Sequence, residues 1–263
     1  MAGAEMGRQG EPAIQGDVVT TPAEAGAVMT LVDHLAELRR RIAISVGALV
    51  VGTIVGFLLS ERLLDILRAP IGDQVLIYLA LGGAFSIRLE LAVMVGVALA
   101  FPVVAWQLWS FVSPGLTPNE RRIARPWVPL MIVFFVIGVG VAYFILPFAA
   151  AFLRSFEIPG VLESRLTAEA YFGFVTMLFL AFGIVMQFPI VIVVLNRIGV
   201  LPIQRLRSSR RYVLLGILIF AVVVTPGGDP VSPSVMTAVM YALFELTIWL
   251  ISRSRRPAPA ADA

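Results

Sequence analysis

The stretch HLAELRRRIAISVGALVVGTIVGFLL, residues 34–59, decides the fold class of this chain. A short polar segment that ends in three consecutive arginines leads directly into an apolar run without a single charge, residues 42–59. A helix needs roughly 20 such residues to cross the hydrocarbon core of a bilayer. The stretch therefore predicts a membrane-spanning helix that is preceded by an amphipathic segment at the membrane surface.

The composition of the whole chain agrees with this interpretation. Of its 263 residues 59% are hydrophobic and 14% are charged, and its mean hydropathy is +0.93, whereas soluble domains carry roughly 25% charged residues. Cysteine is absent, which excludes disulfides and thiolate metal sites, and a single histidine, His34, disfavours a zinc or haem centre. We therefore expect an all-α integral membrane protein without metal or other cofactor.

Six apolar blocks predict six transmembrane helices. They cover about 42–59, 89–111, 127–150, 170–195, 213–224 and 235–251. The last two are short, and the segment TPGGDPVSP between them, residues 225–233, cannot be helical throughout because of its prolines and glycines. We predict a tight hairpin of two short helices there, with a re-entrant hairpin as the alternative.

The arginines predict the topology, since the chain contains no lysine. One set of helix ends carries Arg39, Arg40, Arg41, Arg121, Arg122, Arg125, Arg197, Arg205, Arg207, Arg210, Arg211, Arg253, Arg255 and Arg256. The opposite set carries only Arg62, Arg68, Arg88, Arg154 and Arg165. The positive-inside rule then places the first set and both termini in the cytoplasm. This distribution indicates topology rather than nucleic-acid binding.

The same pattern divides the chain into three parts. Residues 1–28 contain no apolar block, so we expect a disordered cytoplasmic segment rather than a signal peptide. Residues 29–252 form the six-helix membrane domain, and residues 253–263 form a short cytoplasmic tail. The long segments 60–88 and 151–169 are expected to build a short helical cap on the outer side.

Within the predicted spans the candidate polar residues are Gln187 and Glu245. Gln187 precedes Pro189, so its amide can bond either the backbone carbonyls that the proline loosens or a partner helix. Glu245 can reach the membrane interface or pair with an arginine of the segment 197–211. Neither residue has an acid, base or metal ligand nearby in sequence, so we expect no proton relay and no catalytic centre in the spans.

Two acidic residues stand beside arginines at the cytoplasmic edge. Glu37 shares a helical stripe with Arg41, and such a pair contributes only a few tenths of a kcal/mol. Glu120 follows Thr117 and Pro118 in the pattern of a capping box with proline at the first helical position. Carboxylates held in fixed positions at this surface are suited to a cationic partner, and planar guanidinium groups match them best.

Four stretches together resemble one family. They are HLAELRRR (34–41), FPVVAWQLWSFVSPGLTPNERR (101–122), MQFPIVIVVLNRIGV (186–200) and RRYVLLGILIFAVVVTPGGDPVSP (210–233). In order and spacing, over about residues 30–252, they resemble TatC, the multispanning core subunit of the twin-arginine protein translocase. The resemblance implies a glove-shaped receptor in a bacterial or archaeal cytoplasmic membrane. It would recognise signal peptides with two consecutive arginines, associate with itself and with single-span TatA/TatB-type subunits, and export folded proteins with the proton-motive force.

The resemblance also implies roles for individual residues. The expected signal-peptide contacts are Glu37, Glu120, His34 and Arg39. The expected contacts with partner helices are Gln187, Thr225 and Glu245. Structural roles are expected for Pro70, Pro114, Gly115, Pro189 and Asp229. The chain departs from the family twice, because Gln187 stands where many members have a glutamate and Thr117 replaces a frequent tyrosine.

Two other classes of protein fit the sequence less well. A secondary transporter for a small solute would carry polar residues near the midplane of broken helices, and only Gln187 fits that description. A membrane enzyme would need an acid and a base or metal ligands at one depth, and the sequence offers no such cluster. A non-enzymatic translocase subunit is therefore the leading hypothesis.

Overall fold

A computed structural model describes residues 31–72, 76–79, 81–118, 121–122, 125–158, 167–197, 199, 201–225 and 228–254. Within these ranges every regular element is a helix, and an isolated parallel β bridge joins Ile77 to Thr167. The predicted all-α fold is confirmed. The segment 1–28 and most of the predicted tail lie outside the described residues.

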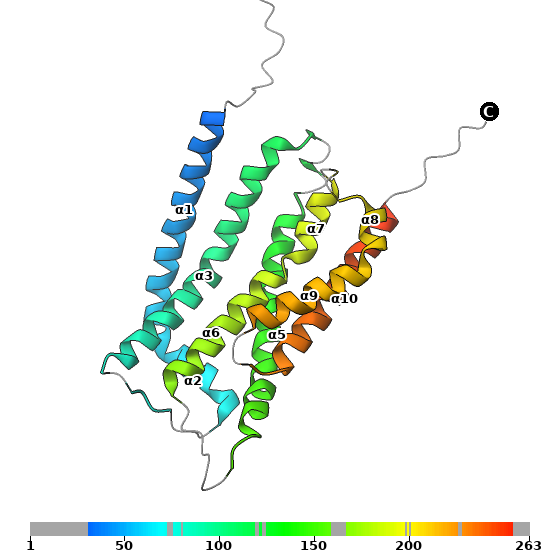
Figure 1. The fold of residues 1–263 in the computed structure, drawn as a ribbon. Coiled ribbons are helices and arrows are strands. Elements are labelled where there is room, and N and C mark those ends of the chain that lie inside the picture. Colours follow the sequence, from blue (N-terminus) through cyan, green and yellow to red (C-terminus); the bar gives the residue numbers. More distant parts are fainter. Residues whose placement is uncertain are drawn as a thin grey trace, which may run out of the picture.

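Long and medium helices form the frame of the described part of the chain (Figure 1). They are α1 (Leu31–Leu58), α3 (Gly83–Val112), α5 (Trp127–Arg154), α6 (Ala168–Val185), α7 (Phe188–Arg197), α9 (Arg210–Val224) and α10 (Val231–Ser254). Shorter helical pieces are α2 (Ser60–Arg68), η1 (Ala69–Ile71), η2 (Ser113–Gly115) and α8 (Ile203–Ser208). By length and composition, five helices of the described chain can cross a membrane, with α6 and α7 counted as one interrupted span.

The fifth predicted span, 213–224, is α9, which is a helix but a short one. Its 15 residues extend for about 22 Å at the helical rise, less than the roughly 30 Å of a hydrocarbon core. The prediction that the last helix is also short is wrong: α10 extends over 24 residues and is long enough to span a membrane, because it begins at Val231 within the proline-rich segment. Between them Gly228 has a φ of +69°, and Asp229 Oδ1 accepts a hydrogen bond from the Ser232 N–H at 2.7 Å. The predicted break in this segment is confirmed.

The fourth span is interrupted at the predicted proline. Helix α6 ends at Val185 and α7 begins at Phe188, with a turn at Met186 and Gln187. Pro189 is buried in the first turn of α7. Backbone N–H groups in the first turn have no acceptor within the helix, so the missing N–H of proline costs no helical hydrogen bond there. The Gln187 carbonyl accepts bonds from the N–H groups of Ile190 and Val191 instead.

Small residues allow α1 and α3 to pack backbone against backbone. A Cβ atom at Gly52 would lie 2.7 Å from the Gly96 carbonyl oxygen, and Gly56 similarly faces the backbone of Ala92. Glycines in this spacing are typical of close helix pairs in membranes. Helix α1 packs mainly against α3, so most of its apolar surface is left for lipid or a partner.

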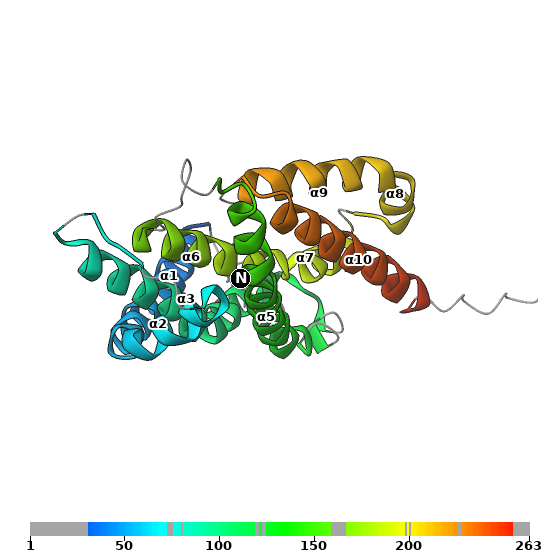
Figure 2. The ribbon, with the colours of Figure 1, turned by 90° about the horizontal axis from the view of Figure 1, so that it is seen from below.

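The main buried core lies between α3, α5 and α6. Phe182, Leu146 and Leu91 are fully buried there, and a second cluster around Phe244 and Ile192 joins α7, α8 and α10. Seen from below, the helices spread from α1 and α3, through α6, α5 and α7, to α10 and α9 (Figure 2). The arrangement is therefore elongated rather than a closed bundle.

Helix α2 and η1 form part of the predicted cap at one end of the helices. Pro70 lies in η1 and is half-buried, and the hydroxyl of Tyr171 on α6 donates to the Leu67 carbonyl at 2.7 Å. Helix α1 begins and α10 ends at the opposite end of the molecule (Figure 1).

Candidate receptor site

The predicted acidic residue of α1 is part of a three-residue polar chain. Arg41 Nε donates to Glu37 Oε1 at 3.1 Å, and Arg41 Nη1 donates to Gln107 Oε1 on α3 at 3.3 Å. The Glu37 and Arg41 side chains are 21% and 20% exposed. The second carboxylate oxygen, Glu37 Oε2, is shielded from solvent and has no hydrogen-bond partner among the described residues. The expected pair with Arg41 is confirmed, and it leaves one acceptor unused.

The start of α1 is fixed against the end of α3 by a ring contact. His34 stacks on Phe111, with ring centroids 4.4 Å apart and planes inclined by 24°. Arg39 lies on an exposed face of the same helix. His34 therefore positions the segment that carries Glu37, whereas Arg39 projects away from the α1–α3 contact.

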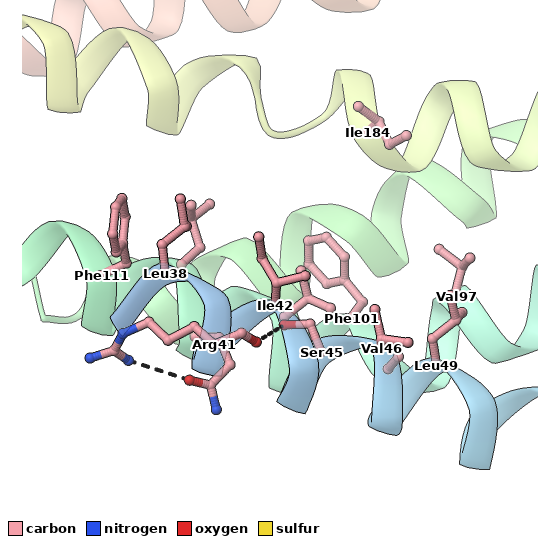
Figure 3. A pocket seen from close by; sticks show the side chains of 14 residues that line it. Leu38, Arg41, Ile42, Ser45, Val46, Leu49, Val97, Phe101, Phe111 and Ile184 are labelled. Carbon is pink, nitrogen blue, oxygen red and sulfur yellow. Dashed lines mark hydrogen bonds between the residues drawn. The ribbon is translucent and has the colours of Figure 1, made fainter. Parts of the chain in front are cut away.

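An apolar groove of about 490 Å³ begins beside this polar chain. Helix α1 contributes its face from Leu38 to Leu49, α3 contributes side chains from Val97 to Phe111, and Ile184 of α6 faces them (Figure 3). The polar side chains Arg41, Ser45 and Gln107 line the groove, and the Ser45 hydroxyl is bonded to the Arg41 carbonyl. The groove is thus polar at one end and hydrocarbon-like along the rest of its length.

The second predicted edge lies after α3. Pro114 and Gly115 are exposed in η2, and Arg121 Nε donates to the Ser113 carbonyl at 3.3 Å. The Arg121 N–H bonds the Thr117 carbonyl at 2.9 Å, which agrees with a helical turn that begins after Thr117. Glu120 lies outside the described residues, so its capping role and its distance from Glu37 stay predictions.

The side-chain amide of Gln187 is bonded through its nitrogen but not through its oxygen among the described residues. Its Nε2 donates to the Met131 carbonyl of α5 at 3.2 Å and to the Gly183 carbonyl at 3.3 Å. Its Oε1 is buried and has no hydrogen-bond partner within the described chain. The amide thus bonds one carbonyl of α5 and one of α6, and its Oε1 is an unused acceptor among the described residues.

The other residues expected at partner contacts are satisfied internally. Glu245 Oε2 pairs with Arg210 at 3.0 Å, and Glu245 Oε1 accepts from the Tyr241 hydroxyl at 3.2 Å, which confirms the predicted pairing with an arginine of the segment 197–211. The Thr225 hydroxyl is buried and donates to the Ala221 carbonyl at 2.6 Å. Asp229 is 3% exposed, and its Oδ1 caps the start of α10.

The comparison with known families decides the identity of this arrangement. The model of the family described as Sec-independent protein translocase protein (TatC) matches residues 33–238. The chain belongs to the TatC family. It is therefore a component of a protein translocase and a multi-pass membrane protein.

Curated TatC relatives and solved TatC structures match most of the chain. The Sec-independent protein translocase protein TatC of Carboxydothermus hydrogenoformans is 34% identical over 225 residues, which are 84% of this chain and 92% of that protein. TatC of Deinococcus radiodurans is 34% identical over 238 residues, 87% of this chain and 88% of that one. A crystal structure of the twin-arginine translocase receptor TatC in the detergent DDM superposes with a TM-score of 0.73 at 31% identity, covering 82% of this chain and 98% of that one. These matches do not support the transporter alternative.

Two carboxylates within the helices were predicted as candidate residues neither from the resemblance to TatC nor from the apolar blocks. Glu90 lies within the predicted block 89–111 of α3, and Glu169 lies inside α6 because that helix begins at Ala168, before its apolar block. Both Glu169 carboxylate oxygens are shielded from solvent without a hydrogen-bond partner among the described residues. Glu169, Gly173 and Thr176 share one face of α6 by their spacing, and a Cβ atom at Gly173 would lie 3.6 Å from Glu90 Oε1. The spacing of Glu169, Gly173 and Thr176 could have indicated from the sequence that this face of α6 is polar.

Proposed function

We propose that this chain is the receptor subunit that binds the arginine pair of twin-arginine signal peptides at Glu37 and Glu120. The observation that carries the proposal is the position of the Glu37–Arg41–Gln107 chain at one end of an apolar groove. The solved relative's description as a twin-arginine translocase receptor supports it. The same proposal places both termini and the arginine-rich helix ends in the cytoplasm.

In this proposal Arg41 occupies the position at Glu37 that the guanidinium of a signal-peptide arginine would take. It satisfies Glu37 Oε1 while Glu37 Oε2 remains a buried acceptor without a donor among the described residues, and an unsatisfied buried acceptor costs about 1–3 kcal/mol. A signal-peptide arginine that displaces Arg41 gains charge-assisted bonds to the carboxylate. Guanidinium is preferred over ammonium because its planar fork can bond both oxygens.

The groove fits the apolar part of the same ligand. Signal peptides place an apolar region of roughly 7–15 residues after their basic region, which as a helix is about 10–22 Å long. The α1 wall of the groove, from Leu38 to Leu49, extends for about 16 Å at the helical rise. A bound peptide would have its arginines at Glu37 and its apolar region along α1 and α3.

Single-span TatA/TatB-type subunits are the proposed partners, and folded proteins exported with the proton-motive force are the proposed cargo. Gln187 is the best-supported contact for a partner helix, because its Oε1 is buried without a partner in the described chain. Thr225 and Glu245 offer less, since their side chains already bond within the protein. The proposed role is that of a non-enzymatic receptor.

Binding of a fluorescent twin-arginine peptide to the protein in nanodiscs tests the proposal. Glu37→Gln keeps the size of the side chain and removes its charge, so we expect roughly a tenfold or greater loss of affinity, the equivalent of one charge-assisted bond. Glu61→Gln is the matched control, because Glu61 is an exposed carboxylate that also pairs with an arginine, Arg88, but lies at the α2 end of the molecule. Equal affinities of wild type and Glu37→Gln, or equal binding of a twin-lysine peptide, would contradict the proposal.

A further inference from the structure

A second cavity lies at the α2 end of the molecule, away from the receptor site. Its volume is about 500 Å³, within the usual range for small-molecule sites. The floor is apolar, formed by residues such as Ile87 and Phe172, which are nearly fully buried. The charged residues that line it are Arg68 and Asp65 of α2 and Arg88 of α3, with Tyr78 beside them.

The two arginines have bonding capacity to spare. Arg88 Nη2 pairs with Glu61 Oε1 at 2.7 Å, but both side chains are substantially exposed, so the pair itself contributes little. A guanidinium has five N–H donors, and this pair uses one of them. Arg68 has no ion pair within 4.0 Å among the described residues, although Asp65 lies one helical turn before it on α2.

The surroundings of the cavity place it at the membrane interface. Leu79, Leu81 and Phe85 adjoin the lining residues in sequence and are 81%, 105% and 61% exposed, and Tyr78 on the cavity wall is 59% exposed. Such apolar and aromatic surface in a membrane protein is covered by lipid, and tyrosine is typical of the head-group level. We therefore expect the phosphates of the adjoining leaflet at the depth of Arg68 and Arg88.

We propose that this cavity binds a phospholipid with a primary ammonium head group. The phosphate would bond Arg68 and Arg88, the ammonium would bond Asp65, and the start of the acyl chains would lie against the apolar floor. The lining carries two cations and one carboxylate, which complements a zwitterionic head group with a hydrogen-bonding ammonium better than a purely anionic one. The lipid would join α2 to the first turns of α3 and α6. This inference does not depend on the proposed receptor function.

Native mass spectrometry of the purified full chain, with equal amounts of dioleoyl phosphatidylethanolamine, phosphatidylglycerol and phosphatidylcholine added, tests the site. We expect preferential retention of phosphatidylethanolamine, and about a tenfold loss of that retention in Arg68→Gln and Arg88→Gln, as for a lost charge-assisted bond. Arg62→Gln is the matched control, because Arg62 is an exposed arginine of α2 that does not line the cavity. Asp65→Asn should remove the preference for phosphatidylethanolamine over phosphatidylcholine. Ala84→Phe, which fills the cavity without changing its charge, should also lower retention.

Several outcomes would overturn the assignment. One is equal retention in Arg62→Gln and Arg68→Gln, whether both lose the lipid or both keep it. Another is retention of phosphatidylglycerol or phosphatidylcholine at the level of phosphatidylethanolamine in the wild type. A third is displacement of the lipid by millimolar inorganic phosphate, which would show a site for free phosphate instead.

Discussion

Replacement of Gly52 by alanine tests whether α1 is held by backbone contact with α3. An added Cβ atom would lie 2.7 Å from the Gly96 carbonyl oxygen, 3.1 Å from Gly96 Cα and 3.3 Å from Gly96 C. All three neighbours are backbone atoms, which no rotamer change can move away, so the two helices must separate by roughly 0.5–1 Å. A gap of that size forfeits about a quarter to a half of each van der Waals contact along the seam.

The expected cost is that of overpacking, about 1–3 kcal/mol. For a chain of this size that corresponds to a fall in Tm of roughly 2–12 °C. The assay is thermal unfolding of the detergent-solubilised protein, followed by tryptophan fluorescence or by loss of the monodisperse peak on size exclusion. Gly52→Ala is expected to lower Tm in both measurements.

Gly47→Ala is the matched control, because it makes the same chemical change on the same helix. A Cβ atom at Gly47 meets nothing within 4 Å, so the substitution only restricts the unfolded chain and favours the helix, a gain of about 0.4–1 kcal/mol. The two substitutions should therefore change Tm in opposite directions. If Gly52→Ala raised Tm as much as Gly47→Ala, the close contact between α1 and α3 would be refuted.

Three further substitutions test the polar groups. Arg41→Gln removes the side chain that occupies Glu37 and is expected to tighten binding of a twin-arginine peptide severalfold in the nanodisc assay; weaker binding would show that Arg41 positions Glu37 rather than competes for it. Gln187→Leu removes two side-chain bonds to backbone carbonyls and should lower the stability by about 1 kcal/mol, read as Tm, with no effect expected on peptide affinity. Asp229→Ala removes the cap of Ser232 and should cost about 1 kcal/mol, whereas Asp229→Asn, which keeps a capping oxygen, should cost less; equal losses in Tm would argue against capping.

The sequence predicted the features of this fold that depend on local pattern. The apolar blocks located the helices, Pro189 located the break between α6 and α7, and the proline-rich segment 225–233 located the turn before α10. The pair between Glu245 and an arginine of the preceding segment was predictable because the hairpin brings its two helices together. Apolar runs and prolines restrict the backbone conformation of their own segment, and the short hairpin brings the partners of the ion pair together.

The features that escaped prediction depend on how closely distant helices approach. Gln107 is 66 positions from Arg41, and nothing local marks it as the acceptor that completes the polar chain. Ile184 faces the groove because of the approach of α6 to α3. The buried carboxylate of Glu169 was missed because α6 extends beyond its apolar block, and helix ends are set by tertiary packing more than by hydropathy.

The glycine seam, which is the close contact of α1 and α3 at Gly52 and Gly96, is connected to the receptor site through α3. Because α1 packs mainly on α3, and α3 in turn packs on α6, the distance from the α1 wall of the groove to Ile184 is set by the contact at Gly52 and Gly96. Larger residues in the seam would move Leu38 and Glu37 together, since both lie on one rigid helix. The small residues of α1 therefore bear on ligand binding as well as on stability: they keep the carboxylate and the apolar wall in a fixed relation to α3, where Gln107 and Phe111 complete the site.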